Sequence, residues 1–211
     1  MGSGTWLEEM ATSCRVLGLD DHDESLAIAG PRIRAVGGSV LKTSLERIAL
    51  PDGCASAITA MDVLEHLEDD AGALKELVRL LRPGGVAVVT VPAMPSLWSD
   101  WDEALHHIRR YTRRGLRDLV SQTDVDVLRV AYFNTAAVLP AWLVRSWRKR
   151  RGAGSVWAEH VVPWPGVNGF LESVMVTPSR WRWLRPPLGL SLIAVLRKRQ
   201  ASDPSSVTTS S

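Results

Sequence analysis

Three adjoining segments decide the fold: Met61-Asp-Val-Leu-Glu-His-Leu-Glu-Asp-Asp70, Ala73-Leu-Lys-Glu-Leu-Val-Arg-Leu-Leu-Arg-Pro-Gly-Gly85 and Val88-Val-Thr-Val-Pro92. Between Asp70 and Leu81, apolar residues recur at the spacing of one helix face, and the Arg-Pro-Gly-Gly sequence after them is a strong helix stop. The apolar run Val86 to Val91 has the profile of a strand that is buried on both faces. These segments predict a helix over 70–81 followed by a buried strand. The apolar helix face consists of Leu74, Leu77, Val78 and Leu81.

The alternation of strand and helix continues on both sides of these segments. Arg15 to Asp20 is a short apolar run that ends in an acid, and it precedes a helical stretch from Glu24 to Ala29. Alternation at this spacing is typical of a parallel sheet with helices on both sides, so the predicted fold class is α/β. Further strands are predicted at Ser39 to Lys42, Ala57 to Ala60, Val125 to Phe133 and Leu188 to Leu196, and further helices at 112–121, 135–151 and 167–175.

The composition suits one globular domain with a substantial core. The chain has 211 residues, of which 45% are hydrophobic and 23% are charged. We expect this domain to span residues 1–200 and the Ser- and Thr-rich tail 201–211 to be disordered. The net charge of only +2 gives no reason to expect nucleic-acid binding, so no nucleic-acid partner is predicted.

Cysteine usage and hydropathy indicate the compartment. The two cysteines, Cys14 and Cys54, have no metal-type spacing, so neither a disulfide framework nor a metal site is predicted. No segment approaches the roughly 20 apolar residues that span a bilayer, and the chain does not start with a basic region followed by an apolar run. We therefore expect a cytoplasmic protein that is not an integral membrane protein.

Together, the three segments closely resemble the fourth strand, the following helix and the fifth strand of class I S-adenosylmethionine-dependent methyltransferases of the type 11/12 kind. An amphipathic helix ended by Pro-Gly-Gly would explain the helix stop alone, but not the Glu-His block, the stop and the strand together. The resemblance implies a Rossmann-like, doubly wound sheet and S-adenosylmethionine as the cofactor. It also implies that Met61, Asp62 and His66 lie along the wall of the cofactor site.

Two further positions match the cofactor half of this family. Asp20 ends what looks like the family's second strand, whose terminal acid binds the two ribose hydroxyls of the cofactor; one carboxylate can accept both hydrogen bonds. The other interpretation of Asp20 is an N-cap for the helix after it. Ser44 and Leu45 occupy the place where family members hold the adenine, mainly through main-chain groups.

The first motif departs from the family pattern. Family members have an apolar strand ending in an acid and then a Gly-x-Gly-x-Gly loop, whose bare backbone lets the methionine end of the cofactor approach closely. This chain begins Met1-Gly-Ser-Gly-Thr-Trp-Leu-Glu-Glu-Met10, which resembles only the second part of that loop and the helix after it. The resemblance assigns Gly2 and Gly4 to the cofactor loop, with Trp6 near the place of the third glycine. A Gly-Ser-Gly start is also typical of a vector-derived linker.

The resemblance therefore implies that the family's first strand, which lies between its second and fourth strands, is absent from this chain. Each unpaired buried amide or carbonyl costs roughly 1 to 3 kcal/mol, so a stable, active monomer is not expected from this chain alone. Either the true start lies upstream, another segment fills the gap, or the protein is a degenerate relative; an oligomer is compatible with the sequence. The family's Phe-Asp before the fourth strand is replaced by Ala55-Ser56, which agrees with a departure from the pattern.

The segment Asp102-Glu-Ala-Leu-His-His-Ile-Arg-Arg-Tyr-Thr112 matches an Asp…His-x-Arg-Arg-Tyr-Thr segment in one bacterial branch of the family. It falls in the acceptor or lid region, which we expect at residues 95–185. The resemblance makes His107 the candidate general base, because a histidine near neutrality can take a proton from the acceptor. Arg109, Arg110 and Tyr111 are the candidate substrate residues. The alternative for this cluster is a solvated polar loop.

The predicted helix 135–151 has an apolar body and a basic end, Arg145-Ser-Trp-Arg-Lys-Arg-Arg151. Such a helix can rest on a membrane surface, with its cations against anionic headgroups. It can equally pack against the core, since a basic end complements the helix dipole. The sequence thus predicts methyl transfer to a small-molecule or lipid-like acceptor, with peripheral membrane contact through residues 136–151 as one option. The alternative is an inactive relative that serves as a binding or assembly subunit.

Overall fold

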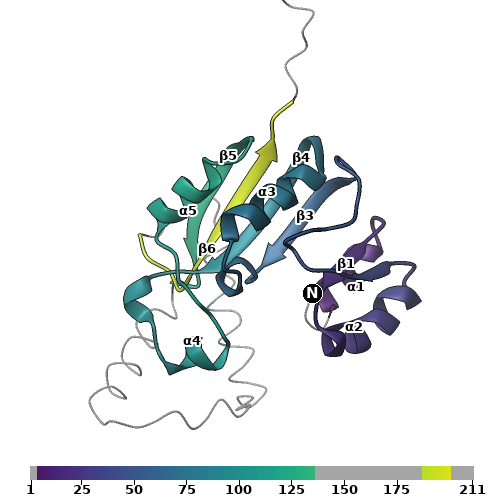
Figure 1. Cartoon of the computed structure of the whole chain (residues 1–211), viewed down its shortest axis with the longest axis horizontal. Helices are drawn as coiled ribbons and strands as arrows, with labels where there is room; N and C mark the ends of the chain where they lie inside the picture. The colour runs from purple at the N-terminus through teal and green to yellow at the C-terminus, as the bar shows by residue number, and fades with distance from the viewer. Residues whose placement is uncertain (1–3, 136–186, 201–211) are drawn as a thin grey trace, which may run out of the picture. The chain divides into compact units, whose positions relative to one another are not determined.

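The computed structural model of the protein describes residues 4–135 and 187–200 (Figure 1). These residues belong to two compact units, Met1–Pro51 and Asp52–Ser211. The predicted helices at 135–151 and 167–175 and the predicted disordered tail lie outside the described residues, apart from Thr135. Across the described part of the chain, no helix is long and apolar enough to cross a membrane.

The first unit is a two-stranded parallel sheet with two helices. Its elements are α1 (Thr5–Ala11), β1 (Leu17–Asp20), α2 (Asp23–Ala35) and β2 (Ser39–Lys42). Leu17 lies opposite Ser39 and Asp20 opposite Lys42, so both strands end at the same edge. The predicted strand at 39–42 is confirmed.

Helix α2 is longer than predicted. The sequence predicts a helix over Glu24 to Ala29, whereas α2 continues through Pro31 to Ala35. Proline lacks the N–H that would bond four residues back, which costs the helix one hydrogen bond. Burial of Ala29 and Ile33 on the same face offsets that cost, because both side chains are fully buried.

Gly4 precedes α1 in a conformation that suits glycine. Its φ is +75°, and a Cβ placed there would lie 2.7 Å from the Cβ of Ala29. Gly37, after α2, has a similar φ of +80° but no atom within 4 Å of such a Cβ. The two glycines therefore differ in steric crowding and not in backbone conformation.

This difference leads to a first prediction. Gly37→Ala should cost about 1 to 2 kcal/mol, because an L-residue is strained in the left-handed region. Gly4→Ala should cost about 1 to 3 kcal/mol more, because its methyl group overlaps Ala29. Urea unfolding followed by circular dichroism measures both losses, and equal losses would show that Gly4 is not packed against α2.

The second unit is built on a four-stranded sheet in the order β3-β4-β6-β5. Its strands are β3 (Ala55–Met61), β4 (Leu81–Pro92), β5 (Val125–Phe133) and β6 (Ser191–Lys198). β3 and β4 are parallel, whereas β6 runs antiparallel to both β4 and β5. The prediction of a parallel sheet is therefore wrong for β6. Alternation of strand and helix along the sequence does not determine the direction of a strand that inserts between two others.

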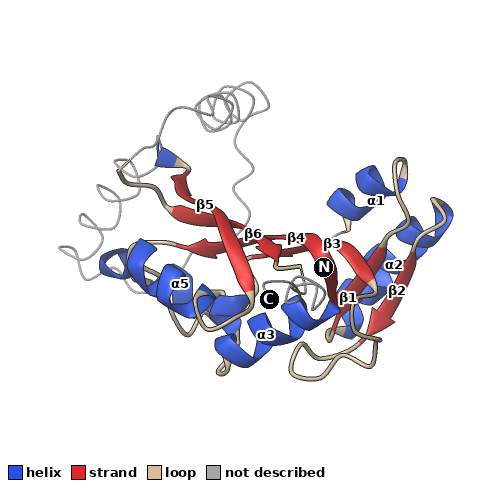
Figure 2. Cartoon of the chain, turned by 90° about the horizontal axis from the view of Figure 1, so that it is seen from above, coloured by secondary structure: helices blue, strands red, loops and turns tan. Residues whose placement is uncertain are grey.

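Two predicted helices lie among the described residues of the second unit, and each ends one residue before its predicted bound. α3 (Asp70–Leu80) begins after Asp69, whose Oδ1 accepts a 2.7 Å hydrogen bond from the N–H of Gly72. β4 then starts directly at Leu81. α5 (Arg113–Val120) contacts α3, and both helices lie on the same side of the sheet (Figure 2). The short elements are η1 (Leu64–His66), η2 (Pro95–Leu97) and α4 (Asp100–Ala104).

One face of β4 is more buried than the other, although the sequence predicts burial on both. Ala87, Val89 and Val91 are fully buried, whereas Val86 and Val88 are only partly buried. The helices α3 and α5 cover one face of the sheet, which accounts for this alternation (Figure 2).

The described strands form two separate sheets. Among them β1 pairs only with β2, and β3 pairs only with β4. The predicted doubly wound arrangement is thus divided into a two-stranded and a four-stranded sheet.

Candidate functional site

The carboxyl end of β3 holds two of the predicted cofactor residues. The side chain of Met61 is largely exposed, and Asp62 follows it with a φ of 51°. The N–H of Asp62 donates to the carbonyl of Thr90 at 3.0 Å, and the Thr90 hydroxyl donates to the Asp62 carboxylate at 3.3 Å. Ligands of open α/β sheets bind outside the carboxyl ends of the strands, so both residues occupy a suitable edge.

Asp102 is the centre of the segment that contains the predicted base. Its side chain is fully buried. It accepts hydrogen bonds from the N–H of Ser99 at 3.0 Å, from Nδ1 of His107 at 3.1 Å and from Nε of Arg110 at 2.6 Å. Burial raises the pKa of Asp102, but its hydrogen bonds and the charge of Arg110 outweigh burial and hold the pKa below its usual value. Asp102 is therefore a carboxylate at neutral pH.

His107 and Asp102 form a dyad of the kind that orients a general base. The carboxylate can only accept, so Nδ1 of His107 carries the proton and Nε2 presents a lone pair. A second bond, from the N–H of His107 to the carbonyl of Asp102 at 2.8 Å, fixes the backbone. The His107 side chain is 10% exposed, so the ring that carries Nε2 is held in one orientation.

The predicted substrate residues are bonded within the protein. Arg110 also donates to the carbonyl of Ala93 at 2.7 Å, and its side chain is 5% exposed. Arg109 pairs with Asp70 at 3.0 Å, and the hydroxyl of Tyr111 donates to the same carboxylate at 2.8 Å. Burial, together with the Asp70 carboxylate, raises the pKa of Tyr111. These bonds fasten the 109–111 segment to α3, and contact with an acceptor stays a prediction.

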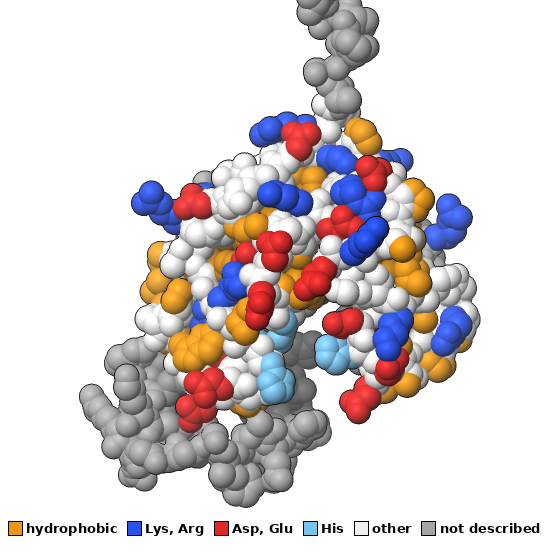
Figure 3. Space-filling view, in the orientation of Figure 1, with side chains coloured by type: hydrophobic (Ala, Val, Ile, Leu, Met, Phe, Trp, Pro, Cys, Tyr) orange, Lys and Arg blue, Asp and Glu red, His pale blue; other side chains and the backbone are white. Residues whose placement is uncertain are grey.

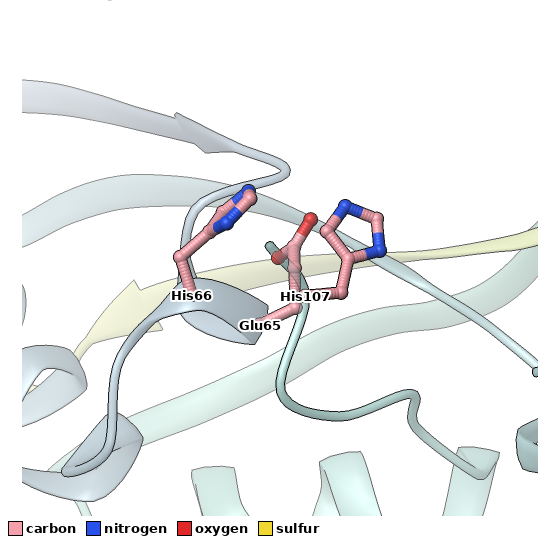
Figure 4. Close-up of side chains that lie close together, drawn as sticks. All are labelled: Glu65, His66 and His107. Atoms are coloured by element: carbon pink, nitrogen blue, oxygen red, sulfur yellow. The ribbon is translucent and has the colours of Figure 1, made fainter. Parts of the chain in front are cut away.

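Glu65 and His66 lie beside His107 (Figure 4). Glu65 is fully buried, and burial raises the pKa of its carboxyl group to about 8. The more exposed His66 bonds through Nδ1 to the carbonyl of His106 at 3.3 Å, and burial of its ring lowers its pKa. The ring centroids of His66 and His107 are 4.9 Å apart. Histidine side chains are visible at the surface in Figure 3.

Sequence reasoning gave no role to the two buried acids of this site, Glu65 and Asp102, although both lie in motifs that resemble the family. Asp102 had a local signal, since Ser99-x-x-Asp102 is the pattern of a capping box at the start of α4. Glu65 had none beyond its place next to His66. Its burial depends on the segment after α4, whose Ile108 N–H donates to the Glu65 carbonyl at 2.9 Å.

The other predicted cofactor residues belong to the first unit. Asp20 lies at the carboxyl end of β1, and its Oδ1 accepts from the N–H of His22 at 3.0 Å. His22, and not Asp20, is the N-cap residue of α2. Ser44 and Leu45 follow the end of β2, and the Ser44 hydroxyl accepts from the N–H of Glu46 at 3.2 Å. Gly2 lies outside the described residues. Cofactor binding by these residues stays a prediction.

Comparison with known proteins finds similarity to methyltransferases. The family model described as methyltransferase domain matches residues 1–89. A probable S-adenosylmethionine-dependent methyltransferase of Mycolicibacterium smegmatis is 32% identical over 115 residues, covering 54% of this chain and 44% of the relative. The ubiquinone biosynthesis O-methyltransferase of Sodalis glossinidius is 31% identical over 125 residues, covering 56% of this chain and 49% of the relative. The chain thus matches less than half the length of these relatives.

A solved structure supports the fold. Geranyl diphosphate methyltransferase in complex with S-adenosylmethionine superposes with a TM-score of 0.62 at 16% identity, over 93% of this chain and 75% of that one. This similarity shows a class I methyltransferase fold, as predicted from the sequence.

Proposed function

We propose that the protein transfers a methyl group from S-adenosylmethionine to a hydroxyl or amine acceptor, because the methyltransferase-domain family model matches residues 1–89. The observation that supports the reaction most strongly is the Asp102–His107 dyad. S-adenosylmethionine supplies, when bound, an electrophilic methyl group on a sulfonium.

The described residues fit the chemistry of that cofactor. Asp20 offers a carboxylate at the end of a parallel strand, and its side chain is 9% exposed. A carboxylate in that place suits the two vicinal ribose hydroxyls. Within the first unit, Ser44 and Leu45 would supply the adenine contacts and Gly4 the close backbone approach, while Gly2 lies outside the described residues. Within the second unit, Met61, Asp62 and His66 would offer a wall at the end of β3.

The protein's own part in the reaction is to take and stabilise a proton. Nε2 of His107 accepts the proton of the acceptor as its oxygen or nitrogen bonds to the methyl carbon. Asp102 stabilises the imidazolium that forms, and Arg110 keeps Asp102 ionised. Asp102 is thus a positioning residue, whereas His107 is the candidate catalytic residue.

A lipid-like acceptor is the preferred class. The Sodalis relative bears the name of an enzyme of ubiquinone biosynthesis, and the solved neighbour that of a geranyl diphosphate methyltransferase. A cytoplasmic enzyme whose segment 136–151 rests on the membrane surface would meet such acceptors. That segment lies outside the described residues. The alternative is an inactive relative that serves as a binding subunit. It is favoured because β1 and β3 each pair with only one strand in the described part of the chain.

Calorimetric titration with S-adenosylmethionine tests the cofactor site. Asp20→Ala should weaken binding at least about tenfold, because hydrogen bonds to a charged group are worth about 1.5 to 3 kcal/mol. Asp21→Ala is the matched control: it removes the neighbouring exposed carboxylate and should leave affinity unchanged. Equal affinities for wild type and Asp20→Ala would contradict the ribose assignment, and no binding by wild type would favour the binding-subunit alternative.

A further inference from the structure

Three side chains from two segments converge near the surface of the second unit. Glu65 and His66 belong to η1, and His107 follows α4. One carboxylate oxygen and one ring nitrogen of each histidine all lie within 4.8 Å of one another. Figure 4 shows the Glu65 carboxyl group between the two imidazole rings.

The hydrogen bonds of both rings leave the same nitrogen available. Nδ1 of His66 meets the carbonyl of His106, and Nδ1 of His107 meets the carboxylate of Asp102. A carbonyl and a carboxylate can only accept, so both Nδ1 atoms carry the proton and both Nε2 atoms present lone pairs. Histidines that bind metals are held in this way, with the other ring N–H donated to a carboxylate or a backbone carbonyl.

Glu65 is the third member of this cluster. Neither of its carboxylate oxygens has a hydrogen-bond partner among the described residues, although Glu65 is fully buried. Buried carboxylates are normally paired or bound to a metal, since an isolated one is strongly disfavoured. The two Nε2 lone pairs beside it cannot donate to a Glu65 carboxylate; they can accept only from the protonated acid, and a bound cation would take the place of that proton.

We propose that Glu65, His66 and His107 bind one divalent transition-metal ion through a Glu65 oxygen and the two Nε2 atoms. Imidazole ligands suit Zn²⁺ and Fe²⁺, whereas Mg²⁺ and Ca²⁺ prefer oxygen ligands alone. Ligands about 2.1 Å from a tetrahedral ion lie about 3.4 Å apart. The three ligand atoms lie within 4.8 Å of one another, so they would have to move closer together to bind an ion.

Three protein ligands leave a coordination position for a small oxygen ligand. Its occupant would be water or the hydroxyl oxygen of the acceptor, whose pKa the ion lowers. The ion would occupy the Nε2 of His107 that otherwise accepts the proton. In the metal-bound protein, an acceptor hydroxyl bound to the ion would therefore release its proton to solvent. This consequence rests on the proposed function, whereas metal binding itself does not.

The test is metal binding by the whole chain without cofactor or acceptor. Chelator-treated protein is titrated with Zn²⁺ against a chromophoric chelator, and with Co²⁺, whose visible absorption reports nitrogen and oxygen ligation. Wild type should bind one ion per chain at this site. Glu65→Gln and His66→Asn should each weaken binding at least about tenfold, and excess Mg²⁺ should not displace the ion.

His106→Asn is the matched control. Its ring is exposed and outside the cluster, and asparagine tolerates its φ of 57° while keeping the backbone carbonyl that bonds His66. This variant should bind like wild type. Far-UV circular dichroism checks that each variant is folded.

Failure of wild type to bind Zn²⁺ or Co²⁺ would overturn the proposal, as would tight binding by folded Glu65→Gln and His66→Asn. Loss of binding in His22→Asn but not in Glu65→Gln would also overturn it, because it would place the ion among Asp20, Asp21 and His22 in the first unit. Methyl transfer without metal binding would contradict this inference alone, whereas metal binding without methyl transfer would contradict only the proposed function.

Discussion

Asp102→Ala should lower the free energy of unfolding by about 3 to 5 kcal/mol, because it leaves the buried guanidinium of Arg110 without its carboxylate partner. Urea unfolding at neutral pH measures the loss. Asp118→Ala is the control, since Asp118 belongs to an exposed pair with Arg114 and its removal should change stability little. Comparable effects in the two variants would show that the Asp102 network contributes no more than a surface ion pair.

The same network sets a pH dependence. The pKa of Asp102 is held below its usual value, so the folded protein binds this proton less tightly than the unfolded chain. The stabilisation is therefore fully present above the unfolded pKa of about 3.9 and is lost as the pH falls through the lower pKa of the folded state. Asp102→Ala should lack this part of the acid dependence.

His107→Asn should slow methyl transfer about 10² to 10⁴-fold, the usual contribution of a positioned general acid or base. Transfer of labelled methyl to a series of quinol and isoprenoid alcohol acceptors measures the rate. Cofactor affinity should not change, because the base acts on the acceptor. His106→Asn, one residue away and exposed, should keep the wild-type rate. Full activity in His107→Asn would remove this residue from the reaction.

Local patterns predicted the elements of this fold well where local forces decide them. The helix at Asp70 and the strands at 39–42 and 125–133 begin where the sequence predicts, since apolar periodicity and turn residues act within a few positions. β6 begins three residues after its predicted start at Leu188. Its antiparallel direction depends on pairing with β4, about 100 residues earlier, and no local signal reports it.

The candidate site was predictable only in part for the same reason. His107 and His66 were recognised because they belong to segments that resemble a family. The burial of Glu65 and the bonds of Asp102 arise only when residues about 40 positions apart meet, as Ile108 and Glu65 do. Arg110 was predicted to be an acceptor-side residue, which stays a prediction, and only the structure reveals its bonds to Asp102 and Ala93.

The central place of β6 affects how the chain can fold. β6 comes last among the described strands, yet it lies between β4 and β5 and pairs with both. During synthesis, β4 and β5 leave the ribosome long before residues 191–198. Neither strand can therefore pair with β6 while the ribosome is still adding the intervening chain. The sheet of the second unit can close only after residues 191–198 have left the ribosome, and until then the edges of β4 and β5 need protection from other nascent chains.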